Sequence, residues 1–204
     1  MSASAADGRR SKVHTGIGSR STPTRALHLM ERLAARLAQL GWTLRSGGAD
    51  GADSAFERGA ARHEGACTIF LPWPAFSGAK GIVAPAQTAQ TAQTAQRAEA
   101  IVSAVHPIWN SLPPPVKALH TRNVYQVLGL ELDQPSAFVL CWTPDAAECE
   151  ASSSRSTGGT RSAIVIAARH AAPVINLHRT DSLTRLAELV NSFELSSPSE
   201  TRSD

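Results

Sequence analysis

The chain has 204 residues, 42% of them hydrophobic and 18% charged, which suits one globular domain with a buried core. Its formal net charge of +3 comes from scattered basic residues without a dense run, so a nucleic-acid partner is allowed but not required. No apolar stretch approaches the roughly 20 residues that a membrane span needs, and the three cysteines lack metal-type spacing. We therefore expect a cytoplasmic protein that contacts no membrane and uses neither a metal nor a cofactor.

Both ends of the chain are polar, rich in serine and without periodicity. Such segments bury too little apolar surface to fold, so we expect disordered tails over residues 1–11 and 195–204. A single nucleotide-binding domain is expected over residues 12–194, with an insertion at about 73–135 that interrupts the alternation of strand and helix patterns.

Short apolar runs alternate with stretches in which apolar residues recur at helical spacing. In chain order, strands are predicted over residues 13–18, 42–45, 67–71, 137–142 and 173–177. The helices that alternate with them are predicted over residues 23–40, 53–63, 161–170 and 183–193. Strands that are apolar on both faces are typical of parallel sheets covered on both sides. The predicted fold is therefore α/β, a Rossmann-like doubly wound and mainly parallel sheet of about five or more strands, with helices on both faces and an inserted helical or lid segment.

Three glycine-rich loops follow predicted strands or precede predicted helices. They are GIGSR at residues 16–20, SGGADGAD at 46–53 and TGGTRS at 157–162. Glycine lets a ligand approach the backbone closely, and the unpaired N–H groups of a helix's first turn favour an anion such as phosphate. In an open parallel sheet these loops gather at the carboxyl ends of the strands, where ligands bind. The alternative is that they are ordinary capped surface turns.

The loops predict a pocket for a nucleotide-like small molecule. Its predicted ligand-binding residues are Gly16, Gly18, Ser19, Arg20, Ser46, Gly47, Gly48, Asp50, Gly51, Asp53, Trp142, Thr143, Gly158, Gly159, Thr160 and Arg161. Arg20 and Arg161 would grip a phosphate and Trp142 would stack on a base, with solvated arginines and a packed tryptophan as the alternatives. Asp50 and Asp53 are candidates for ribose binding or general-base catalysis, with helix capping as the alternative.

The inserted segment contains an Ala-Gln-Thr tract at residues 86–96, which predicts either an exposed helix extension or a flexible loop. A helix predicted over residues 119–129 carries His120, Arg122 and Asn123. Because His120 and Asn123 are three apart, they share a helix face. We expect these three residues to contact the ligand as part of a lid.

The order GIGSR, SGGADGADSAFERGA and GGTRSAI, with the HPxW and LHxRN segments between, resembles the Rossmann-like SLOG superfamily. That superfamily unites the DNA-processing protein A of bacterial transformation with the lonely-guy phosphoribohydrolases. The similarity spans residues 12–177 and is greatest to short bacterial and phage members of unknown role. It implies a pocket for a nucleotide or ribose-phosphate derivative at the loops after the first, second and fourth strands. The phosphoribohydrolases have a hydrolytic glutamate where this chain has Ala163, so that acid/base group is missing.

From the sequence we expect binding of a nucleotide or ribose-phosphate derivative, for sensing or sequestering. One alternative is a hydrolase of an N-glycosidic or phosphoribosyl bond, which Ala163 disfavours. Another is a single-stranded DNA-binding recombination accessory related to DNA-processing protein A. Because basic and aromatic residues are not interleaved, we expect any nucleic-acid binding to be weak and strongly salt-dependent. A homo-oligomer is compatible with the sequence.

Overall fold

In the computed structural model, which describes residues 11–83 and 89–196, one open sheet holds six strands in the order β4-β3-β2-β1-β5-β6. The strands are β1 (Val13–Gly16), β2 (Thr43–Ser46), β3 (Cys67–Leu71), β4 (Ile82–Val83), β5 (Phe138–Cys141) and β6 (Val174–Asn176). Every pair of neighbouring strands is parallel. Because the order runs outward from β1 in both directions, the sheet is doubly wound, which confirms the predicted fold class.

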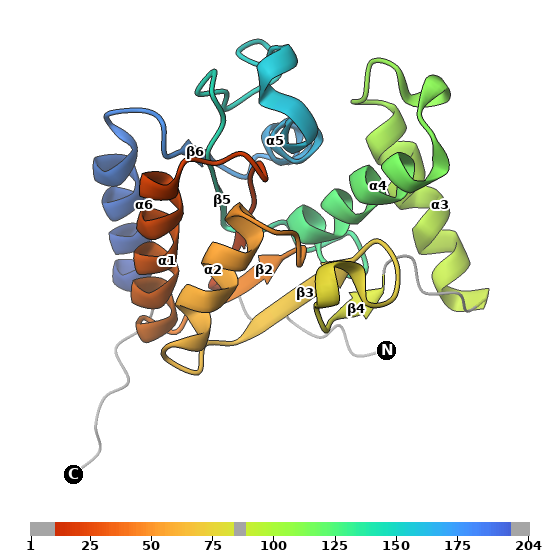
Figure 1. Cartoon of the computed structure of the whole chain (residues 1–204). Helices are drawn as coiled ribbons and strands as arrows, with labels where there is room; N and C mark the ends of the chain where they lie inside the picture. Colours follow the sequence, from red (N-terminus) through yellow and green to blue (C-terminus); the bar gives the residue numbers. More distant parts are fainter. Residues whose placement is uncertain (1–10, 84–88, 197–204) are drawn as a thin grey trace, which may run out of the picture.

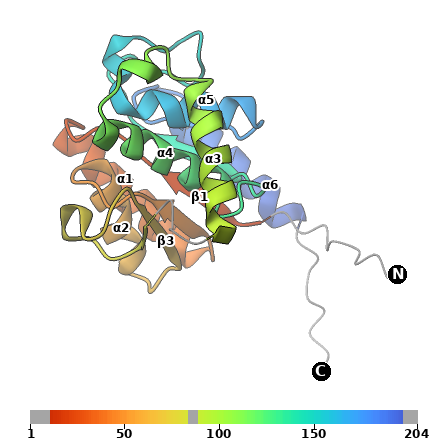
Figure 2. The same ribbon diagram turned by 90° about the vertical axis from the view of Figure 1, so that its right-hand side faces the viewer.

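Helices cover both faces of this sheet (Figure 1). One face carries α1 (Thr24–Gln39), α2 (Ala52–Ala61) and α6 (Ser182–Ser196). The other face carries α3 (Ala89–Ser103), α4 (Pro114–Leu128) and α5 (Arg161–Arg169), and Figure 2 looks onto α3 and α4. Within the described residues, no helix is long and apolar enough to cross a membrane.

The helices form where the apolar residues fall on one face. In α1, Met30, Ala34 and Leu37 recur at helical spacing and are at most 3% exposed. The helix ends before Gly41, whose φ of +76° allows the chain to turn toward β2. All four residues of β5 are buried, as expected of a central strand in a sheet covered on both faces.

An aromatic cluster fills the core beneath α1 and α6. His14 of β1 is 1% exposed, and its ring stacks on Phe138 with a centroid distance of 5.6 Å. Trp42 meets both rings, at 6.4 Å from His14 and 4.8 Å from Phe138. These contacts tie the two central strands to the start of β2, so the cluster joins neighbouring parts of the sheet.

The segment predicted as an insertion is part of the main architecture. Besides α3 and α4 it contains β4, which has only two residues and so gives no periodic pattern. α4 is packed into the core, with Val124, Val127 and Leu128 all at 0% exposure, rather than lying over a pocket as a mobile lid. α3 begins at Ala89, so the described part of the Ala-Gln-Thr tract is helical.

The described residues reach into the predicted carboxyl-terminal tail. α6 continues through Ser196, two residues into the predicted tail. The rest of that tail, and the predicted tail before Ser11, lie outside the described residues.

Candidate functional site

A pocket of about 390 Å³ lies where the strand order reverses between β1 and β5. Such switch points are where open α/β sheets bind ligands, because the loops on either side diverge. The walls come from the loops after β1 and β2, from α4, and from the segment that precedes α5. The lining residues are Ile17, Gly18, Ser19, Arg20, Ala49, Asp53, Val116, Leu119, His120, Arg122, Asn123, Gly159 and Thr160.

A buried ion pair forms the floor of the pocket. The Nη1 atom of Arg122 donates to Oδ2 of Asp53 at 3.1 Å, and the two side chains are 6% and 1% exposed. A Cβ atom on Gly47 would overlap the guanidinium of Arg122, so glycine is required there. Burial raises the pKa of the Asp53 carboxyl, and the charge of Arg122 opposes that shift. The pair therefore fixes the Arg122 guanidinium against the loop after β2.

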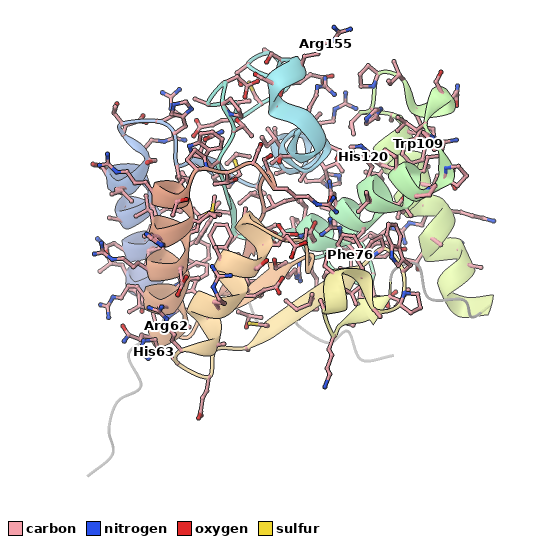
Figure 3. All side chains as sticks on the ribbon, in the orientation of Figure 1. Arg62, His63, Phe76, Trp109, His120 and Arg155 are labelled. Atoms are coloured by element: carbon pink, nitrogen blue, oxygen red, sulfur yellow. The ribbon has the colours of Figure 1, made fainter. Side chains whose placement is uncertain are left out.

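Two guanidinium groups converge on one aromatic ring beside the pocket. The Cζ atoms of Arg20 and Arg122 lie 5.8 Å and 5.9 Å from the ring centroid of Phe76. Phe76 belongs to η1 (Phe76–Gly78), a short 3-10 helix after β3 (Figure 3). Asp53 offsets the charge of Arg122, whereas Arg20 has no ion-pair partner within residues 11–83 and 89–196. The pocket thus carries an uncompensated positive charge.

Hydrogen bonds join α4 to the start of α5. Asn123 Nδ2 donates to the Gly159 carbonyl at 3.2 Å and to Ser162 Oγ at 2.9 Å. The Nδ1 atom of His120 lies 2.9 Å from the same Ser162 hydroxyl. Burial, and then the nearby His106 and Arg122, lowers the pKa of His120 from 6.5 to about 4. At neutral pH the His120 imidazole is therefore uncharged, and the positive charge of the pocket resides on its arginines.

The loop after β2 supports the pocket more than it lines it. The N–H of Gly48 donates to Glu57 Oε1 at 2.9 Å, and the N–H of Ala49 donates to Asp53 Oδ2 at 3.3 Å. These amides are therefore already paired within the chain. Ser46 is fully buried beneath the loop. The loop's contribution is to hold Asp53, and through it Arg122.

The structure brings nine of the predicted site residues to this pocket. They are Gly18, Ser19, Arg20, Asp53, His120, Arg122, Asn123, Gly159 and Thr160. The predicted residues that do not line it are Gly16, Ser46, Gly47, Gly48, Asp50, Gly51, Trp142, Thr143, Gly158 and Arg161.

Three of the predicted residues that do not line the pocket make contacts elsewhere. The guanidinium of Arg161 donates to the Val105 carbonyl at 2.6 Å and pairs with Glu150 at 3.2 Å. Thr143 is fully buried, and its hydroxyl oxygen accepts from Asn176 Nδ2 at 2.8 Å. Trp142 lines a different hollow, on the other side of the loop after β1.

Apolar residues of the pocket were not anticipated from the sequence. Val116 and Leu119 line it together with His120 and Asn123. These four positions fall at i, i+3, i+4 and i+7 and so form one face of α4. The helical spacing was the signal that could have identified them.

The two catalytic candidates differ in placement. Asp50 is exposed and does not line the pocket, whereas Asp53 lines it within the ion pair. Ala163 is fully buried in the core, so a glutamate at this position would place a carboxyl among apolar side chains. The arrangement is suited to binding an anion, with arginines and polar groups around a concave site.

The fold and the pocket define a class, a doubly wound α/β domain with a cationic pocket at its switch point. Within that class, the family model of DNA recombination-mediator protein A matches residues 6–128, more than half of the chain. The chain belongs to this family, which confirms the resemblance found in the sequence. No curated protein matches the sequence.

A solved structure shares the fold. DNA processing protein A from Helicobacter pylori, described for its unique single-stranded DNA binding mode, matches with a TM-score of 0.50 and 18% sequence identity. The match covers 92% of this chain and 80% of that chain. At this level of identity, the similarity establishes the architecture of the sheet and its helices.

Proposed function

We propose that this protein binds single-stranded DNA, with a backbone phosphate held in the pocket between Arg20 and Arg122. The observation that carries the proposal is the convergence of two guanidinium groups on Phe76, one of them without a carboxylate partner in the described chain. Arginine binds phosphate oxygens through a planar pair of donors, so two such groups around one concavity favour a phosphate. Membership of the recombination-mediator family supports DNA as the source of that phosphate.

Within this proposal each side chain has a separate role. Arg20, which is exposed and unpaired, supplies the net charge that attracts the DNA backbone. Arg122 is fixed by Asp53 and supplies an oriented donor. Val116 and Leu119 offer apolar contact to a sugar or a base, while His120 and Asn123 offer neutral hydrogen-bonding groups.

The test is fluorescence anisotropy with a labelled oligothymidine, measured for the wild type and for Arg20→Ala over a range of salt concentrations. Loss of one phosphate contact should reduce the magnitude of the slope of log affinity against log salt concentration by about 0.7. At 0.1 M salt this corresponds to a roughly fivefold loss of affinity. Arg36→Ala is the matched control, because this exposed arginine lies in the last turn of α1, away from the pocket. Equal affinities and slopes for the wild type and Arg20→Ala would refute the proposal.

A second candidate function is the binding of a free nucleotide derivative. The size of the pocket, about 390 Å³, favours it because cavities of this order commonly enclose small ligands. Calorimetry with nucleoside monophosphates, cyclic nucleotides and ADP-ribose tests it directly. A mononucleotide that binds more tightly than an oligothymidine, and loses affinity in Arg20→Ala, would establish this candidate in place of the first.

A further inference from the structure

A second hollow lies on the opposite side of the loop after β1 and has a volume of about 980 Å³. We call it the Trp142 groove. It is lined by Pro23, Arg25, Ala26, His28, Leu29, Arg32, Trp142, Leu177, His178, Thr180 and Leu183. These residues come from Pro23 and α1 up to Arg32, from the segments that follow β5 and β6, and from the start of α6.

The groove is basic, and its charge is not compensated. Arg25, His28 and Arg32 fall at i, i+3 and i+7, so they follow one face of α1. All three are exposed, and neither arginine forms an ion pair with any residue that the structure describes. The nearest carboxylates along the chain already form ion pairs. Glu31 pairs with Arg58 of α2 and with Arg62, which directly follows that helix. Asp181 pairs with Arg179 and Arg185.

The groove also presents a fixed aromatic surface. The rings of Trp142 and His178 stack with a centroid distance of 5.2 Å and an interplanar angle of 23°. The Nδ1 atom of His178 lies 3.0 Å from the Thr143 carbonyl. Because a carbonyl only accepts, Nδ1 carries a proton and the ring is held in place. An ordered ring pair beside cationic side chains is the combination that single-stranded nucleic acids use, with bases stacked and phosphates paired.

The groove begins where the loop after β1 ends. Gly18, Ser19 and Arg20 of this loop line the pocket, whereas Pro23, its last residue, lines the groove together with Arg25 and Ala26 of α1. At the back of this loop, a Cβ atom on Gly18 would lie 3.6 Å from the Trp142 carbonyl oxygen. Arg20 of the pocket and Pro23 of the groove are three residues apart along the chain, so a strand whose phosphate rests on Arg20 would continue across this loop into the groove.

We propose that the Trp142 groove is a second subsite for single-stranded nucleic acid, in which a base stacks on the Trp142–His178 ring pair and flanking phosphates pair with Arg25 and Arg32. The inference rests on the proposed function, because it takes the strand as continuing from the pocket. The stacking surface favours nucleic acid over an acidic protein segment, which would need the arginines but not the rings.

The test compares short and long labelled oligothymidines, of two and ten nucleotides, on the full chain. In the double variant Arg25→Ala/Arg32→Ala, affinity for the ten-nucleotide strand should fall roughly 25-fold at 0.1 M salt, from two lost phosphate contacts. Affinity for the dinucleotide, which the pocket alone holds, should not change. The matched control is Arg97→Ala, since it removes an exposed arginine of α3, a helix on the other face of the sheet from α1.

Base stacking is tested separately. An oligothymidine should quench tryptophan fluorescence in the wild type but quench it less in Trp142→Leu, and a ten-nucleotide abasic strand should bind more weakly than oligothymidine. Circular dichroism of Trp142→Leu verifies that the variant is folded.

The outcomes separate the two proposals. If Arg20→Ala weakens both oligonucleotides while Arg25→Ala/Arg32→Ala binds both like the wild type, the groove inference is overturned and the proposed function stands. If the groove double variant loses binding while Arg20→Ala does not, the groove is supported and the pocket proposal fails. Binding of a polyglutamate peptide that matches oligothymidine in affinity, with the same loss in the double variant, would overturn the assignment to nucleic acid.

Discussion

The buried histidine of β1 should make the protein less stable in mild acid. Burial lowers the pKa of His14 from 6.5 to about 3 in the folded chain, whereas the unfolded chain keeps the ordinary value. Between these two values only the unfolded state binds the proton, so stability is complete above pH 6.5 and is lost as the pH falls toward 3. From pH 7 to pH 5 the expected contribution is about 2 kcal/mol, at roughly 1.4 kcal/mol for each pH unit below 6.5.

Urea denaturation at pH 7 and pH 5, followed by tryptophan fluorescence, measures this loss for the wild type and for His14→Phe. Phenylalanine preserves the aromatic packing against Trp42 and Phe138 but cannot be protonated. Any packing cost of the larger ring is common to both pH values and cancels in the difference. The contribution of His120, whose pKa is also lowered, is present in both proteins. If His14→Phe loses as much free energy of unfolding between pH 7 and pH 5 as the wild type, the argument from burial is refuted.

Two further predictions concern the frame of the pocket. Asp53→Asn should lower the free energy of unfolding by about 3–5 kcal/mol because it leaves the Arg122 charge buried and unpaired. The double variant Asp53→Asn/Arg122→Met should lose less free energy of unfolding than Asp53→Asn alone. Equal losses for the two variants in urea denaturation would show that the two side chains are not energetically coupled. Gly48→Ala should cost about 2–4 kcal/mol, since its φ is +67° and the new Cβ would meet two side chains at 2.8 Å. Gly41→Ala, at φ +76° in open space after α1, should cost about 1–2 kcal/mol in the same assay, and a similar cost for both would contradict the steric argument.

The alternation of apolar runs and helical stretches was enough to predict the sheet. Parallel strands buried on both faces, such as β5, are continuous apolar segments, and the order of elements along the chain then implies a doubly wound topology. β4 escaped prediction because it consists of Ile82 and Val83 alone. It forms through its pairing with Phe70 and Leu71 in β3, which is a tertiary interaction.

The candidate site was only partly predictable, because a sequence motif does not say what a side chain contacts. The loop after β1 could be placed from its position behind a predicted strand, and Arg20 does line the pocket. Arg161 lies in a similar glycine-rich loop, yet it is held by the carbonyl of Val105, which is 56 residues away. Trp142 also follows a central strand, but it lines the other hollow, where its ring stacks on His178. Such partners depend on the packing of separate elements.

The central position of β1 has a consequence for how the protein is made. β1 pairs with β2 on one side, within the first 46 residues, but its other neighbour, β5, begins only at Phe138. During synthesis the amino-terminal half therefore emerges with one edge of its central strand bare, which is a template for unwanted pairing with other chains. The match to the family model ends at residue 128, before that edge is covered. A fragment that stops there should aggregate, because this edge of β1 is covered only after β5 has left the ribosome and paired with it.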